Sequence, residues 1–132
     1  LYLVKTLVTL LNGEIKVEGD LYVTDEFDLY TSNGRITVSN VKADCDISLD
    51  TSNGKIIATN IDASRLIFDT SNGDIELSVL GDYDDYRIEM DTSNGDCHVD
   101  NIEKNDSLYN PNANKLLRLS TSNGDIEIDF IG

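Results

Sequence analysis

The sequence has no tryptophan, one proline and one histidine in 132 residues, and only 10 lysines and arginines against 25 aspartates and glutamates. Because the formal charge of −15 would repel nucleic acids and anionic membranes, neither is an expected partner. No apolar run approaches the roughly 20 residues of a membrane span, so we expect no transmembrane segment in this chain. GxSxG, HExxH, CxxC, P-loop and dinucleotide-binding patterns are also absent, which leaves no recognisable catalytic motif.

Two cysteines cannot define a disulfide framework. Cys97 occupies a position that other parts of the chain fill with isoleucine, and Cys45 is in phase with the apolar residues Ile47 and Leu49. We therefore expect both cysteines to be free and to point into the core. The chain begins with Leu1, from which we expect either that the native start has been removed or that the chain is a piece of a longer protein.

What the chain has in abundance is the stretch Thr31-Ser32-Asn33-Gly34. The same four residues recur at positions 51–54, 70–73, 92–95 and 121–124, and a degenerate copy, Leu11-Asn12-Gly13, precedes them. A near-constant period of about twenty residues is typical of a repeat architecture. The length fits one domain, so we predict a single repeat domain over residues 1–132.

Alternating apolar residues stand before and after each copy. The pairs before the five intact copies are Phe27/Leu29, Ile47/Leu49, Leu66/Phe68, Ile88/Met90 and Leu117/Leu119. The pairs after them are Ile36/Val38, Ile56/Ala58, Ile75/Leu77, Cys97/Val99 and Ile126/Ile128. This period of two predicts half-buried strands and essentially no helix. Asn40, Asn60 and Asn101 suggest a second corner in each unit.

Two architectures fit this pattern. Each Asn-Gly could be the turn of a β-hairpin, or it could be a corner of a β-solenoid whose coils stack in parallel. A hairpin needs only Asn-Gly, whereas stacked coils explain the repeated threonine and asparagine as hydrogen-bonding ladders and the glycine as a residue with positive φ. We predict an all-β, right-handed, single-stranded parallel β-helix of about six coils of about twenty residues, stacked in sequence order.

The five TSNG copies with their flanking strands resemble the bacterial toastrack family of adhesin-like repeat domains, whose function is unknown. The resemblance runs from about Val4 to Ile131. It implies a β-helical scaffold and an extracytoplasmic place in the bacterial cell envelope, and it carries no catalytic residues. We therefore expect a non-enzymatic module that binds an unknown protein or glycan at the cell surface, with no cofactor.

Acidic side chains gather beside the corners. Sequence-order stacking would bring five aspartates to one edge, namely Asp69, Asp74, Asp91, Asp96 and Asp125. Oxygen ligands in a cluster suit Ca²⁺, so these residues are candidate metal ligands, although corner aspartates commonly accept hydrogen bonds from turn amides instead. An alternative function is a polysaccharide-acting β-helix enzyme that uses surface carboxylates and a divalent cation. The lone His98 should face solvent beside Glu76 and Glu127.

Two segments, residues 82–86 and 101–115, interrupt the period. Insertions in solenoids often form binding loops, and these contain Tyr83, Tyr86 and Tyr109, which we predict as contact residues for a partner. A third possibility is a purely structural repeat domain that self-associates end to end through open strand edges.

Overall fold

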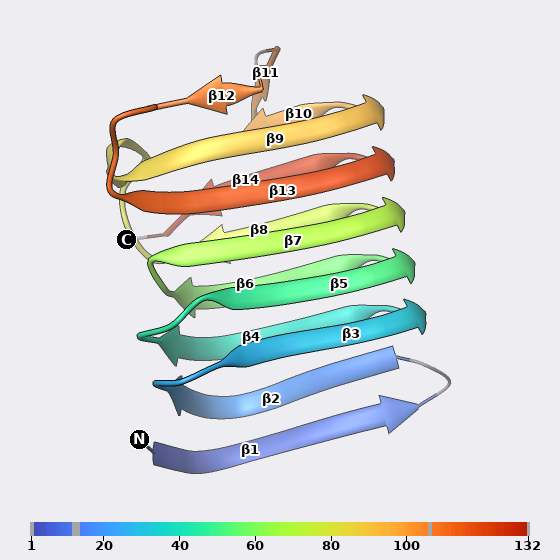
Figure 1. Ribbon diagram of the computed structural model, residues 1–132, viewed down its shortest axis with the longest axis vertical. Coiled ribbons are helices and arrows are strands. Elements are labelled where there is room, and N and C mark those ends of the chain that lie inside the picture. Colours follow the sequence, from blue (N-terminus) through green and yellow to red (C-terminus); the bar gives the residue numbers. More distant parts are fainter. Residues whose placement is uncertain (1, 12–13, 106, 132) are drawn as a thin grey trace.

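The computed structural model describes residues 2–11, 14–105 and 107–131, and it consists of two β-sheets that lie face to face (Figure 1). The larger sheet contains, in spatial order, β1 (Tyr2–Leu11), β2 (Glu14–Val23), β4 (Ile36–Ala43), β6 (Ile56–Asp62), β8 (Ile75–Val79), β14 (Ile126–Phe130), β10 (Cys97–Val99) and β11 (Ile102–Lys104). The smaller sheet contains β12 (Leu108–Tyr109), β9 (Tyr86–Asn94), β13 (Lys115–Asn123), β7 (Arg65–Asn72), β5 (Ile47–Asn53) and β3 (Phe27–Asn33). We call them the eight-stranded and the six-stranded sheet.

Each intact TSNG copy joins a strand of the six-stranded sheet to a strand of the eight-stranded sheet. Five coils result, β3–β4, β5–β6, β7–β8, β9–β10 and β13–β14, and neighbouring coils pair in parallel. This confirms the predicted all-β parallel solenoid. The single helical segment among the described residues is a 3-10 turn, η1 (Tyr83–Asp85), and no helix there could cross a membrane.

The core lies between the two sheets and is built from the alternating residues of both. Most of the pairs that flank the corners are buried, including Leu49, Phe68 and Ile88 from one sheet and Ile56 and Ile75 from the other. Burial of one such aliphatic side chain contributes about 1.5–3 kcal/mol before its conformational entropy is subtracted. Cys97 is buried and Cys45 packs against the core, and both thiols are free, as predicted.

Side-chain ladders hold the corners together. The amide of each asparagine donates to the side-chain oxygen of the asparagine in the next coil: Asn53 to Asn33 at 2.9 Å, Asn72 to Asn53 at 2.8 Å, Asn123 to Asn72 at 2.8 Å and Asn94 to Asn123 at 2.7 Å. The hydroxyl of each of these threonines donates to the glycine carbonyl of the neighbouring coil. The bonds run from Thr51 to Gly34, Thr70 to Gly54, Thr121 to Gly73 and Thr92 to Gly124, at 2.8–3.0 Å. The TSNG motif is therefore a stacking element, as the sequence predicted.

The glycine of the motif is required chiefly by the close approach of neighbouring corners. A Cβ on Gly54 would lie 1.9 Å from the carbonyl oxygen of Gly34, and one on Gly124 would lie 2.1 Å from that of Gly73. Gly34 and Gly73 do have positive φ, but Gly54 does not. The predicted reason, a positive φ at every level, is therefore incomplete. Asn40 and Asn60 adopt φ of 60° and 59°, as a second corner requires. Asn101 also has a positive φ, of 64°, but it lies in the turn of the antiparallel hairpin β10–β11, so the predicted corner of a coil is wrong there.

The predicted sequence-order stacking is wrong at the C-terminal end of the chain. Coil β13–β14, the last in sequence, lies between β7–β8 and β9–β10, so that β9 pairs with β13 instead of β7 (Figure 1). The Tyr86 side chain, at the start of β9, reaches across this inserted level and donates to the carbonyl of Ala63 at 2.6 Å. The segment that joins β8 to β9 thus lets the chain pass over one level, which its last coil fills.

The first repeat is not a coil, so the prediction of six coils is also wrong. β1 and β2 pair antiparallel within the eight-stranded sheet, from Tyr2↔Tyr22 to Leu11↔Glu14. The degenerate Asn12-Gly13 pair between them lies outside the described residues. The antiparallel pairing of β1 with β2 matches the hairpin alternative, and the sequence between these two strands lacks a complete TSNG motif.

Candidate functional site: a groove lined by two arginines

A groove of about 530 Å³ lies on the outer face of the six-stranded sheet, where β13, β9 and β12 meet. It is lined by Arg87, Glu89, Met90, Asp91, Ser107, Leu108, Arg118, Leu119 and Ser120. The 101–115 insertion makes one wall, because it places β12 antiparallel to β9, with Leu108 opposite Glu89. The groove therefore lies where a regular coil meets the segment that interrupts the repeat.

Strand alternation and register bring the charged side chains of the groove together. Arg87 and Glu89 alternate with the buried residues of β9, and Arg118 does so on β13, so all three point away from the core. Arg118 is directly opposite Glu89 in the parallel pairing of these strands. Arg65 lies on the same face on β7, so three of the four arginines of the chain share this face.

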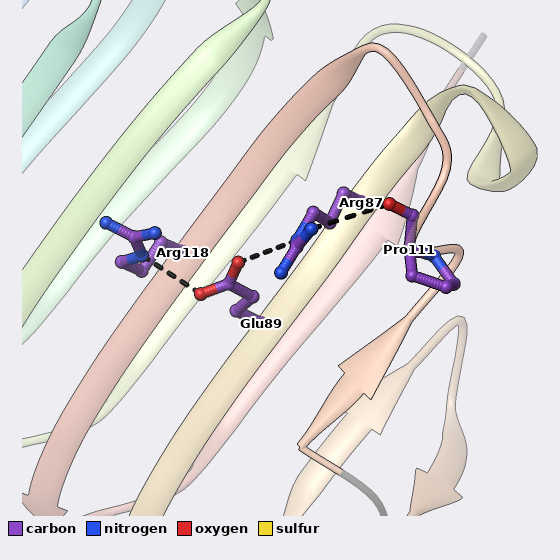
Figure 2. Close-up of polar contacts among 4 residues, drawn as sticks. All are labelled: Arg87, Glu89, Pro111 and Arg118. Carbon is purple, nitrogen blue, oxygen red and sulfur yellow. Dashed lines mark hydrogen bonds and ion pairs between the residues drawn. The ribbon is translucent and has the colours of Figure 1, made fainter.

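Glu89 is held between two guanidinium groups (Figure 2). The Nε of Arg118 donates to Oε1 of Glu89 at 3.0 Å, and the Nε of Arg87 donates to Oε2 at 2.8 Å. Arg87 also donates from Nη1 to the carbonyl oxygen of Pro111 at 3.4 Å. The Arg118 hydrogen bond, followed by that of Arg87, lowers the pKa of Glu89, while its partial burial opposes this effect.

This arrangement leaves donors available on both arginines. A guanidinium carries five N–H donors, and Glu89 uses the Nε of each. Among the described residues, the two terminal nitrogens of Arg118 make no hydrogen bond, and those of Arg87 make one long bond to the Pro111 carbonyl. The groove thus presents oriented N–H groups beside the exposed Leu108, which suits a ligand with an anionic and an apolar part.

The five candidate metal ligands are divided between two columns. Asp74, Asp125 and Asp96 follow one another at the corner, where the N–H of Asp125 donates to Asp74 Oδ1 at 2.8 Å and that of Asp96 donates to Asp125 Oδ1 at 2.9 Å. Asp69 and Asp91 lie one column away with Ser120 between them. In the part of the chain that the structure describes, no three acidic, histidine or cysteine side chains converge as a metal site would require.

The separation of Asp69 from Asp91 follows from the inserted coil, which places Ser120 at the level between them. Asp69 does lie next to Asp50 on β5. Partial burial, and to a lesser extent the negative charge of Asp50, raise the pKa of Asp69. The sequence thus predicted correctly that Asp74, Asp96 and Asp125 share one column, but not that Ser120 separates Asp69 from Asp91.

Two of the three candidate tyrosines lie together at the end of the solenoid. The Nζ of Lys104 lies 5.2 Å from the ring centre of Tyr83 and 5.1 Å from that of Tyr109, and both rings are partly buried. Tyr86 is instead fully buried, since its ring packs 5.8 Å from that of Phe130 and its hydroxyl bonds to Ala63. Its expected role as an exposed contact residue is therefore wrong. Burial raises the pKa of Tyr86 to about 12.

A comparison of the sequence with known protein families supports the same repeat architecture. The Toastrack DUF4097 description matches residues 5–129, which is nearly the whole chain. The chain belongs to the Toastrack family. Searches of the curated proteins and of the solved structures gave no significant match. The family therefore establishes a β-solenoid domain of unknown function, and the groove has to be interpreted from its own chemistry.

His98 lies outside the groove of this Toastrack domain. It is opposite Glu127 of β14 and Glu103 of β11, and Glu76 is one strand further away. The expected neighbour Glu127 is confirmed, whereas Glu76 is displaced by the inserted coil. The groove residues Arg87, Glu89 and Arg118 were not predicted as a site. The alternation of apolar residues in the sequence indicated that these three side chains point away from the core. It did not indicate that β9 and β13 are neighbours.

Proposed function

We propose that this Toastrack domain is a non-enzymatic, adhesin-like binding module of a bacterial cell envelope, and that it recognises a protein or glycan through the groove between β13, β9 and β12. The observation that carries the proposal is the pair of arginines oriented on one carboxylate beside an exposed leucine. Fixed donors next to an apolar surface favour binding, because little conformational entropy is lost when a ligand arrives. The envelope location rests on the resemblance described above.

The solenoid supports this role as a rigid scaffold. Each coil bonds to its neighbours through backbone pairing, the asparagine ladder and the threonine hydroxyls, so the strands that carry the groove are held on both sides. The 101–115 insertion forms the wall of the groove, which agrees with the general placement of binding loops on repeat scaffolds.

A binding screen with a groove variant and a matched control tests the proposal. Leu108→Asp places a charge in the groove at a side chain that is 41% exposed, and Ile102→Asp does the same outside the groove at one that is 61% exposed. We expect immobilised peptides or glycans to bind the parent and the Ile102 variant but not the Leu108 variant. The proposal is overturned if no ligand of the screen depends on Leu108, Arg87 or Arg118.

The enzymatic alternative, a polysaccharide-acting β-helix with surface carboxylates and a divalent cation, is less well supported by the groove. A general acid needs a raised pKa at neutral pH, whereas the two arginines lower that of Glu89. Incubation with polygalacturonate and alginate, with and without Ca²⁺, followed by an assay for new reducing ends, separates the two functions. Ca²⁺-dependent cleavage that Glu89→Gln abolishes would establish the enzyme instead.

Self-association is a second candidate, favoured by one observation. β3 is the end strand of the six-stranded sheet and pairs there only with β5 within the described chain. At the other end of the solenoid, the short antiparallel strands β11 and β12 cover β10 and β9, which is a common protection of sheet edges. β1 is the end strand of the eight-stranded sheet at the same end of the solenoid, so association would use β3 or β1. Light scattering over a range of concentrations tests this, and a constant monomer mass contradicts it.

A further inference from the structure

The groove carries a more specific inference about its ligand, which rests on the binding function proposed above. We infer that it binds an extended peptide in which acidic residues alternate with apolar ones. The acidic face of the peptide lies toward Arg118 and Arg87, and its apolar face lies toward the wall of the groove that Leu108 forms. Three features of the groove carry this inference: the spacing of the two arginines, the N–H donors that they leave available, and the composition of the lining.

The first feature is the spacing of the two arginines. Arg118 is opposite Glu89, and Arg87 lies two residues before Glu89 on β9, so the arginines are diagonal neighbours on adjacent strands. They are separated by about 6.6 Å along the strand direction and about 4.8 Å across it. Alternate side chains of an extended peptide project from the same face about 6.6–7 Å apart. Two alternate carboxylates can therefore reach both arginines at once.

The second feature is the chemistry of the available donors. The terminal nitrogens of Arg118 have no partner among the described residues, and Glu89 already fixes the plane of both guanidinium groups through their Nε atoms. Guanidinium binds carboxylate through parallel N–H bonds, which are stronger than neutral hydrogen bonds. A ligand carboxylate thus meets donors that are already oriented.

Charge along the groove sets the end at which the ligand carboxylates bind. The two positive charges of Arg87 and Arg118 outnumber the single negative charge of Glu89. Asp91, two residues further along β9, is acidic and lies opposite the uncharged Ser120. Carboxylates are therefore favoured at the Arg87 end and repelled at the Asp91 end. The net charge of −15 is spread over the whole molecule, and at about 0.15 M salt charges more than about 8 Å away are largely screened.

The third feature separates a peptide from an acidic sugar. None of the nine lining residues is aromatic, so the groove offers no ring on which a pyranose could stack. It offers Leu108 instead, which is 41% exposed and stands opposite Glu89. An aliphatic side chain beside a carboxylate matches this pair of surfaces better than a hydroxyl-rich uronate does.

The test uses the full chain labelled with ¹⁵N and a capped hexapeptide of alternating glutamate and valine. The matched control ligand carries glutamine in place of each glutamate. We expect the acidic peptide to shift the amide resonances of Glu89, Leu108 and Ser120, and the glutamine peptide to bind at least about tenfold more weakly, because charge-assisted hydrogen bonds are lost. Equal affinity of the two peptides overturns the inference.

Matched protein variants locate the binding. Arg118→Ala and Arg87→Ala should each weaken the acidic peptide by at least about tenfold. Arg65→Ala should change its affinity less than about twofold, because Arg65 shares the face and pairs with Asp46 but does not line the groove. Equal losses in all three variants would indicate a non-specific effect of net charge and overturn the inference.

A third arm distinguishes this inference from the proposed function. Oligogalacturonate is titrated in parallel as the acidic sugar. If it binds through Arg118 and the peptide does not, the groove is a glycan site, so the peptide inference fails while the proposed function stands. If binding of a neutral ligand of the screen depends on Leu108 but not on the arginines, the peptide inference also fails and the proposed function again stands. If no ligand depends on Leu108, Arg87 or Arg118, both proposals fail.

Discussion

The side-chain amide of Asn123 donates a 2.8 Å hydrogen bond to the side-chain oxygen of Asn72, which lies 51 residues earlier in the sequence. Asn94, which is much nearer to Asn72 in sequence, bonds to the other side of Asn123 at 2.7 Å. The last coil of the chain is thus an internal member of the ladder and not its end.

We expect Asn123→Ala to be more destabilising than Asn33→Ala. Asn123 takes part in two ladder bonds, whereas Asn33, at the end of the described ladder, accepts one. At about 0.5–1 kcal/mol for each bond, the free energy of unfolding should fall by about 1–2 kcal/mol for Asn123 and by about half of that for Asn33. Urea unfolding measures both losses, and equal losses would contradict an internal position of Asn123 in the ladder.

Paired cysteines test the order of the coils directly. Ser122 follows Thr121, which is opposite both Thr70 and Thr92, so Ser122 should stand about 4.8 Å from Ser71 and from Ser93. The variant Ser71→Cys with Ser122→Cys should form a disulfide on mild oxidation. Ser71→Cys with Ser93→Cys should not, because these positions are about 9.6 Å apart. Mass spectrometry of digests identifies the bond, and the reverse result would restore sequence-order stacking.

Gly54→Ala should be strongly destabilising. Its Cβ would lie 1.9 Å from the carbonyl oxygen of Gly34, and backbone at a corner paired on both sides has little freedom to move. We expect a loss of at least about 3 kcal/mol, the upper end for overpacking. Ser52→Ala, in the same motif, is the control and should change stability by less than about 0.5 kcal/mol. Thermal unfolding of the two variants provides the comparison.

Tyr86→Phe should lower stability although it preserves the ring. The hydroxyl donates at 2.6 Å to the carbonyl of Ala63, which is also buried and would lose its partner. The expected cost is about 1–3 kcal/mol. Tyr30→Phe is the control, because the Tyr30 side chain is 63% exposed. A neutral result for Tyr86→Phe would show that this hydroxyl does not help to hold β9 above the inserted coil.

The groove should also leave a signature in the pH dependence of stability. The arginines lower the pKa of Glu89 below its ordinary value of 4.5, so the folded state binds this proton less tightly than the unfolded state. The stabilisation by the pair is therefore present above pH 4.5 and is lost as the pH falls through the lowered pKa. We expect Arg118→Ala to cost about 0.5–1 kcal/mol at pH 7 and progressively less toward pH 3.

A control variant separates this effect from the general acid sensitivity of a chain with many carboxylates. In a Glu89→Gln background, Arg118→Ala should cost less and its cost should no longer change between pH 7 and pH 3. Urea midpoints at several pH values measure all four proteins. A pH-independent cost of Arg118→Ala in the parent would show that Glu89 is not its partner.

The sequence predicted the coils but not the groove, for reasons visible in particular residues. The alternation of Leu117 and Leu119 placed Arg118 on the outer surface, and that of Ile88 and Met90 did the same for Glu89. What it could not provide was the pairing of β13 with β9, because every intact copy offers the same asparagine, threonine and glycine to its neighbour.

The sequence by itself determined the strands, the corners, the parallel stacking and the composition of the core. It did so because each of these depends on local alternation and on a motif that repeats identically. The tertiary structure alone decided the order of the coils, and with it the separation of Asp69 from Asp91 and the meeting of Arg118 with Glu89. The physical reason is that ladders of identical residues hold coils together equally well in any order. Non-repeated contacts select one order, such as the Tyr86 hydroxyl on Ala63 and the packing of Phe130 against Tyr86.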